Sequence, residues 1–133
     1  MIRKICIAVG LSAVLIGCSS HNEQKQLELL ASNRASILHA ELPIKSGPLS
    51  IMRASSKGNI IEIMMIYNND APKAKSTQAL LAQSIKSYCT NAETLSNLQA
   101  GLAYRIKIRN TRGQLMIDQL IDQNACKKYA QKQ

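Results

Sequence analysis

The sequence Ile60-Ile61-Glu62-Ile63-Met64-Met65-Ile66-Tyr67 decides the fold class of this chain. Successive side chains of an extended strand point to opposite faces of a sheet. One face of this run therefore holds Ile61, Ile63, Met65 and Tyr67, and the other holds Ile60, Glu62, Met64 and Ile66. Both faces are mainly apolar, which is typical of a central strand. Turn residues over 56–59 and a weakly alternating segment over 49–53 predict that this strand closes a hairpin.

The second apolar face of this strand is a candidate binding surface. A chain of this size has few helices with which to cover both faces of a sheet, and methionine-rich surfaces adapt to peptides. We therefore expect a groove for a partner, with candidate walls at Ile60, Met64, Ile66, Leu81 and Ile85. The alternative is that these side chains pack beneath a helix.

Helices and a second hairpin are expected around this strand, from helical spacing of apolar residues, from alternation, and from cap and turn residues. The expected segments are a helix over 23–39, a turn or extended connection over 43–48, helices over 77–88 and 92–100, strands over 104–109 and 114–121, and a polar, frayed tail over 127–133. Together they predict the α+β class, with a small antiparallel sheet of four to five strands packed against helices and one disulfide.

One face of the second hairpin carries three cations, Arg105, Lys107 and Arg109. Such a row suits an acidic lipid or an acidic protein partner. The interpretation that we prefer is the solvated face of an antiparallel strand, with the binding patch as the alternative.

The N-terminus has the pattern of a lipoprotein export signal. Arg3 and Lys4 precede a mainly apolar run, which ends in Leu15-Ile16-Gly17-Cys18 and matches a lipobox. We expect residues 1–17 to be a signal peptide, and Cys18 to receive acyl chains, palmitate among them, that anchor the mature chain to the membrane. Residues 18–24 are expected to be a lipidated polar leash, and residues 25–133 a single domain. The alternative is an ordinary secretory signal cut nearby.

The cysteines are assigned by position. Cys6 lies in the expected signal peptide and Cys18 at the lipidation site, which leaves Cys89 and Cys126. An even pair in an oxidising compartment predicts a disulfide. A metal site is a weaker alternative, because no histidine or pair of carboxylates accompanies the two thiols.

Composition excludes several function classes. The chain has a net charge of +9, no Phe or Trp, and four Tyr. Base-stacking surfaces need aromatic residues, so a nucleic-acid partner is not expected. No nucleophile–base–acid set or phosphate loop is present in the sequence, and His39 is expected on a helix surface. We therefore expect no enzyme, catalytic residue, metal or cofactor.

Several short motifs occur in a characteristic order and spacing. They are Ser19–Glu23, Leu42–Ser46, Ser84–Cys89, Tyr104–Arg112 and Cys126. In these the chain resembles the AspS (GspS-beta) pilotins of bacterial type II secretion. The resemblance implies an antiparallel sheet with helices against it. It also implies a lipoprotein at the periplasmic face of the outer membrane. Ser19, the residue after the expected lipidated cysteine, resembles the sorting signal for that membrane. The implied partners are the lipoprotein sorting machinery and the C-terminal segment of the secretin subunit, whose targeting and assembly the pilotin directs. A periplasmic inhibitor and a structural envelope lipoprotein are the alternatives.

Overall fold

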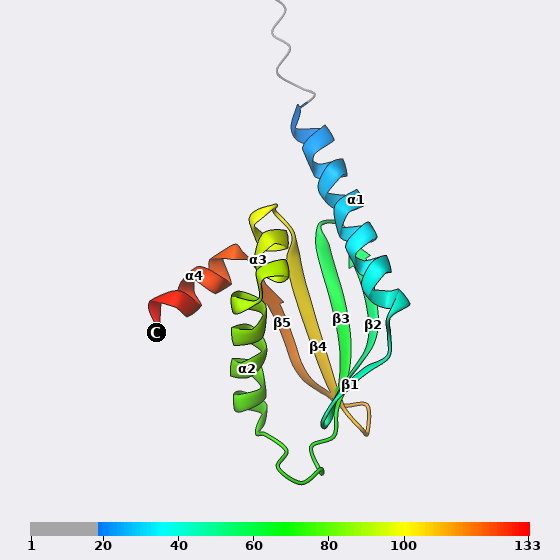
Figure 1. Cartoon of the computed structure of the whole chain (residues 1–133), viewed down its shortest axis with the longest axis vertical. Helices are drawn as coiled ribbons and strands as arrows, with labels where there is room; N and C mark the ends of the chain where they lie inside the picture. The colour runs from blue at the N-terminus through cyan, green and yellow to red at the C-terminus, as the bar shows by residue number, and fades with distance from the viewer. Residues whose placement is uncertain (1–18) are drawn as a thin grey trace, which may run out of the picture.

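A computed structural model describes residues 19–133, which form a five-stranded sheet and four helices (Figure 1). The elements are α1 (Ser19–Ala40), β1 (Ile44–Ser46), β2 (Leu49–Lys57), β3 (Ile60–Tyr67), α2 (Thr77–Thr90), α3 (Ala92–Gln99), β4 (Ala103–Asn110), β5 (Leu115–Ile121) and α4 (Gln123–Gln131). The predicted α+β class, with five strands, helices and a disulfide, is confirmed. The expected signal peptide, Cys6 and Cys18 lie outside the described residues.

The sheet has the strand order β1-β2-β3-β4-β5, with β3 in its centre as predicted. The expected hairpins β2–β3 and β4–β5 are both present and antiparallel. The pairing of β3 with β4 differs from the expected antiparallel sheet, because these strands run parallel, with Ile63 opposite Ile106. Parallel neighbours need a long crossover connection, and here α2 and α3 provide it. The sheet is therefore mixed.

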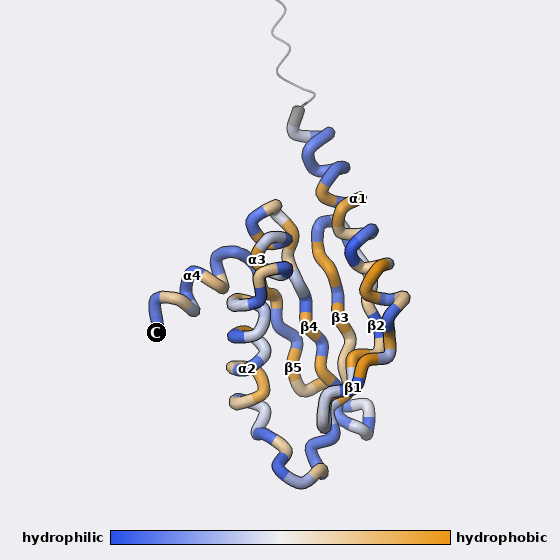
Figure 2. The backbone as a smooth tube through the Cα atoms, in the orientation of Figure 1, coloured by the Kyte–Doolittle hydropathy of each residue, from blue (hydrophilic) through white to orange (hydrophobic). Residues whose placement is uncertain are grey.

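The helix α1 begins earlier than expected. Residues 19–22, which belong to the expected polar leash and precede the helix expected over 23–39, form its first turn, and the described side chains there are exposed. No glycine or proline interrupts this segment, so nothing in the backbone stops the helix from extending. The hydrophilic start of α1 projects beyond the sheet in Figures 1 and 2, whereas its C-terminal half packs on β2 and β3.

Two further elements were not predicted. The short strand β1 pairs with β2 across the Gly47-Pro48 turn, inside the segment expected to be a turn or extended connection. The tail, expected to fray, forms α4 over most of its length. Asp122 caps this helix, since its Oδ1 accepts a hydrogen bond from the Ala125 backbone N–H at 2.8 Å. Tyr129 packs against the core, so α4 is stabilised by contacts rather than by helix propensity.

The core lies between the sheet and the helices on one of its sides. Its largest fully buried side chains are Ile61, Ile63, Leu98, Ile106, Ile108 and Ile121. In Figure 2, orange segments recur along β3, β4 and β5. The predicted disulfide joins Cys89 at the end of α2 to Cys126 in α4, and it holds α4 against the rest of the domain.

Candidate partner-binding groove

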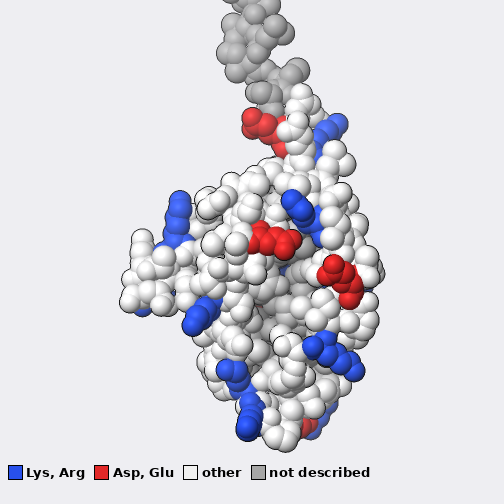
Figure 3. All heavy atoms as spheres, viewed as in Figure 1, with Lys and Arg blue, Asp and Glu red and all other residues white. Residues whose placement is uncertain are grey.

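A groove crosses the helix-covered side of the sheet, between α1 on one side and α2 with α3 on the other. It consists of two hollows of about 330 Å³ and 390 Å³, which meet where Ile51 and Tyr88 face each other. Ile61 and Ile63 underlie the first hollow, and Met65 and Tyr67 underlie the second. The groove therefore follows β3 along its length. Figure 3 shows it as a depression in the middle of this face.

The wall formed by α1 and β2 carries apolar, partly exposed side chains. The floor residues of β3 are at most 3 % exposed, because side chains from the two walls already cover them. On the α1 side, Ile37 is 53 % exposed and stands beside the half-buried Leu38. Leu49 and Ile51 of β2 continue this wall toward the second hollow. These side chains, not the floor, form the accessible apolar surface of the groove.

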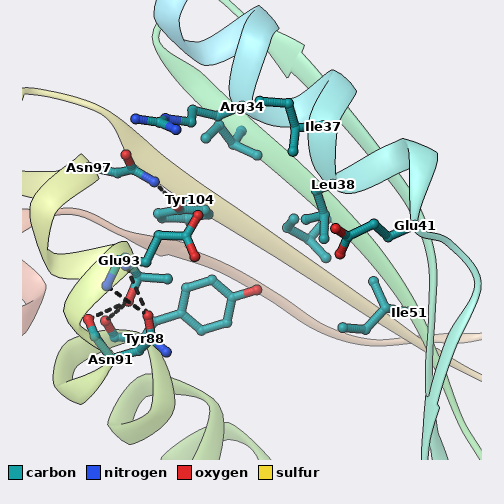
Figure 4. A pocket seen from close by; sticks show the side chains of 13 residues that line it. Arg34, Ile37, Leu38, Glu41, Ile51, Tyr88, Asn91, Glu93, Asn97 and Tyr104 are labelled. Atoms are coloured by element: carbon teal, nitrogen blue, oxygen red, sulfur yellow. Dashed lines mark hydrogen bonds between the residues drawn. The ribbon is translucent and has the colours of Figure 1, made fainter.

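The opposite wall is organised by two tyrosines. The rings of Tyr88 and Tyr104 pack edge to face with their centroids 5.0 Å apart. Asn97 Nδ2 of α3 donates a 2.7 Å hydrogen bond to the Tyr104 hydroxyl, and both residues are buried. Burial raises the pKa of Tyr88, with the neighbouring Tyr104 as a smaller cause, so its hydroxyl stays protonated. Figure 4 shows this hydroxyl pointing across the hollow toward Ile51.

The turn between α3 and β4 packs against the first half of α1. Gly101 has a φ of +104°, a backbone conformation that favours glycine. A Cβ at this position would lie 3.3 Å from the side chain of Leu27, so α1 passes directly over the turn. Asn59 Nδ2 also donates a 2.9 Å hydrogen bond to the Gly101 carbonyl. These contacts join the turn after α3 to α1 and to the β2–β3 turn.

The predicted groove residues do not come together. Ile60, Met64 and Ile66 are half-buried on the other face of the sheet, away from the helices. Leu81 and Ile85 pack against the core, and Ile85 lines a separate hollow of about 600 Å³ beside α4. One groove formed by all five residues is therefore excluded by the topology.

The helices contribute other stripes to the groove. α2 presents Leu80, Gln83, Ser84, Ser87 and Tyr88, and α1 presents Arg34, Ile37 and Leu38, with Glu41 just after its end. Each stripe follows helical spacing, but the α2 stripe is mostly polar or small, so hydrophobic periodicity could not identify it. In α1 one feature of the sequence could have indicated the groove. Ile37 is an apolar residue that lies outside the stripe of α1 that faces the core.

The cationic row of β4 lies on the open face of the sheet, and each member has a partner in the chain. Arg105 makes two 2.8 Å hydrogen bonds to Asp118, and Lys107 Nζ lies 3.2 Å from Glu62 Oε1. Arg109 donates to the Gly113 carbonyl at 2.9 Å. The Arg105 guanidinium lowers the pKa of the exposed Asp118 carboxyl through this hydrogen bond. These contacts are those of a solvated strand face.

His39 accepts a 3.5 Å hydrogen bond from the Ala54 N–H at the edge of β2. Residues 19–133 contain no cluster of three or more His, Cys, Asp or Glu that is arranged to hold a metal ion. None of the helices in this part of the chain is long and apolar enough to cross a membrane.

Comparison with known proteins assigns the chain to a family. Residues 23–126 match the family model "Type II secretion system (T2SS) pilotin, S protein". The solved pilotin EpsS of Vibrio vulnificus is similar, with 56 % identity and a TM-score of 0.76 over 80 % of this chain and 96 % of that one. The solved pilotin AspS of Vibrio cholerae is 51 % identical, with a TM-score of 0.76 over 80 % of this chain and 98 % of that one. The curated Pilotin AspS 2 of Escherichia coli is 27 % identical over 92 % of this chain and 88 % of its own. The chain therefore belongs to the type II secretion system pilotin family.

Proposed function

We propose that this chain is a lipid-anchored, non-enzymatic pilotin that binds the C-terminal segment of the secretin subunit as a helix in the groove beside α1. The observation that carries the proposal is the groove itself, which has an apolar strip along its α1–β2 wall and no occupant from the described chain. Membership of the pilotin family supports the choice of partner. An amphipathic helix that lays its apolar face into such a groove is a common mode of peptide recognition.

The dimensions of the groove fit a helix of a few turns. From Ile61 to Tyr67, β3 rises about 20 Å, which is the length of about 13 helical residues. The exposed part of Ile37, with Leu38, Leu49, Ile51 and Tyr88, offers an apolar strip for one face of that helix. Its polar face would stay in water, so a secretin segment binds without full burial.

The proposed anchor lies next to the helix that forms one wall of the groove. Cys18, the proposed lipidation site, immediately precedes α1. This helix has 22 residues and is about 33 Å long. Acyl chains at its start would tether the domain to the membrane through an ordered spacer. A secretin subunit held in the groove is then carried by the lipoprotein sorting pathway to the outer membrane, where it assembles.

The first experiment measures binding directly. The chain from Ser19 to Gln133, which contains every described element, is titrated with the C-terminal peptide of the secretin from the same genome. Calorimetry gives the affinity, and circular dichroism follows the peptide. We expect saturable one-to-one binding with a gain of helix. Absence of binding at high micromolar peptide would contradict the proposed partner.

The second experiment tests whether the lipid anchor directs the secretin to the outer membrane. In cells, Cys18→Ala is expected to leave the secretin in the inner membrane, although the soluble domain still binds the peptide. Ser19→Asp is the matched variant, because it keeps the anchor and changes only the residue after the cysteine. We expect it to retain both proteins in the inner membrane. Normal secretin multimers in the outer membrane of the Cys18→Ala strain would refute piloting.

A further inference from the structure

Away from the groove, the outer side of α2 and α4 forms a basic surface. Two hollows of about 600 Å³ each lie along it, and they share Ala82 of α2 and Tyr129 of α4. Four lysines line these hollows and a fifth adjoins them on α4, and all five are exposed. We call this the α2–α4 lysine surface; its members are Lys75, Lys86, Lys127, Lys128 and Lys132. Figure 3 shows blue side chains along this side of the molecule and no red ones.

The five lysines have no carboxylate partner within residues 19–133, because the ion pairs there join other residues. Among the described residues, Asp122 is the one acidic side chain that lines either hollow, and its Oδ1 already accepts the hydrogen bond from the Ala125 N–H. The cationic row of β4 differs in this respect, since Arg105 and Lys107 each face a carboxylate. Like charges that gather without partners attract anions from outside the chain.

The helix that carries three of these lysines is firmly held, although it adds little to the core. None of the nine described residues of α4 is buried. The Cys89–Cys126 disulfide nevertheless ties α4 to the end of α2, and so keeps the lysines of both helices on one surface. Apolar side chains lie between them in the first of the two hollows, where Leu120 is 44 % exposed beside the half-buried Ile85.

The position of α4 relative to the proposed anchor narrows the choice of anion. Cys18 directly precedes α1, so an anchored chain has its membrane at the first turn of that helix. In Figure 1 the start of α1 and the C-terminal end of α4 both project from the body of the domain, and a straight line that touches both passes outside the other elements. A flat membrane can therefore meet the anchor and α4 together. The groove, which faces the viewer in Figure 3, stays open.

We propose that the α2–α4 lysine surface binds the anionic phospholipids of the membrane that holds the anchor. Lys127 and Lys128 of α4 and Lys132 at its C-cap make the contact, and Lys75 and Lys86 add to the potential. A lysine is a compact charge on a flexible stem, which suits a layer of mobile phosphates. Clusters of four to eight basic residues beside a membrane anchor are typical of such binding. This inference goes beyond secretin binding and takes from the proposed function only the position of the anchor.

Vesicle binding tests the lipid. The chain from Ser19 to Gln133, which lacks the anchor, is sedimented with vesicles of phosphatidylcholine alone and with vesicles of equal parts phosphatidylcholine and phosphatidylglycerol. We expect binding to the anionic vesicles at low ionic strength and release as salt is added, because the lysines are exposed. Equal binding to both kinds of vesicle, or to neither, overturns the proposal. Binding to poly-glutamate without binding to the anionic vesicles assigns the surface to an acidic protein and overturns it as well.

Charge removal tests the surface. The test variant lacks the three contact lysines, through Lys127→Gln, Lys128→Gln and Lys132→Gln. We expect it to bind anionic vesicles about a hundredfold more weakly, because each lysine near such a membrane contributes about fivefold. The matched control removes three exposed cations from β1 and β2, at the opposite edge of the sheet, through Lys45→Gln, Arg53→Gln and Lys57→Gln. Equal loss of vesicle binding in the two variants overturns the proposal.

Titration with the secretin peptide separates this inference from the proposed function. We expect the α4 variant to bind the peptide as tightly as the parent chain, because its three lysines line neither hollow of the groove. A loss of peptide affinity equal to the loss of vesicle affinity overturns the separation of the two surfaces. Failure of the parent chain to bind the peptide overturns the proposed function and leaves the vesicle result standing.

Discussion

Replacement of Ile37 by alanine is expected to weaken secretin-peptide binding by about fivefold. Ile37 lines the groove from the α1 side, and 53 % of its surface is exposed in the free chain. A helix seated in the groove covers this exposed part. The prediction therefore concerns surface that is buried on binding, and it is separate from the surface that folding already buries.

The magnitude follows from the exposed fraction. Complete burial of an isoleucine side chain is worth about 1.5–3 kcal/mol, so burial of the remaining half contributes about 1 kcal/mol. A free-energy difference of that size corresponds to about a fivefold change in Kd. Since alanine has a higher helix propensity than isoleucine, α1 itself remains formed.

Leu29→Ala is the matched control for this experiment. Leu29 lies on the same helix and is 71 % exposed, but it lines neither hollow of the groove. Calorimetric titration of both variants with the same peptide gives the comparison, and thermal unfolding confirms that both are folded. We expect Leu29→Ala to bind as tightly as the parent chain. Equal affinities for all three chains would refute the assignment of the groove, and so would a larger loss in Leu29→Ala.

Three further predictions concern stability and titration. Cys89→Ser removes a cross-link between residues 37 apart and should lower the free energy of unfolding by about 4 kcal/mol on the chain-entropy model; urea unfolding checks this, and an unchanged midpoint would contradict it. Asn97→Ala leaves the buried Tyr104 hydroxyl without its donor and should cost about 1–3 kcal/mol, also measured in urea; a neutral effect would show that water replaces the donor. Arg105→Gln should return the lowered pKa of Asp118 toward its ordinary value of about 3.9, as followed by NMR of the carboxyl carbon. Because that pKa is depressed in the folded chain, the pair's contribution to stability is present above the ordinary pKa and is lost as pH falls through the lowered one; a pH profile of stability that Arg105→Gln leaves unchanged would contradict this.

The local sequence pattern was sufficient to predict most of the strands and helices. The doubly apolar run of β3 predicted a central strand, and the alternation in β4 predicted its half-buried neighbour. Both hairpins and the helices α2 and α3 followed from turn and cap residues, since these effects act over a few residues. The α4 helix was missed because a disulfide and a tyrosine contact stabilise it, and both depend on the finished fold.

The candidate site was predicted less well than the fold. The sequence indicated a groove over β3 but placed it on the face of Ile60, Met64 and Ile66. When both faces of a strand are apolar, its alternation does not say which face the helices cover. Leu81 and Ile85 of α2 do not line this groove either, because the apolar stripe of that helix packs on the core. Its groove side is largely polar.

The sequence by itself determined the α+β class, the central strand, the paired cysteines and the resemblance to pilotins. Only the tertiary structure decided that β3 and β4 run parallel and that the helix-covered side of the sheet carries the groove. The reason is that the groove walls come from α1 and α2, which are separated along the chain by three strands. The periodicity of a sequence shows which residues share a face of one helix or strand. The distance between two helices depends on the connection between them and on how both pack on the sheet.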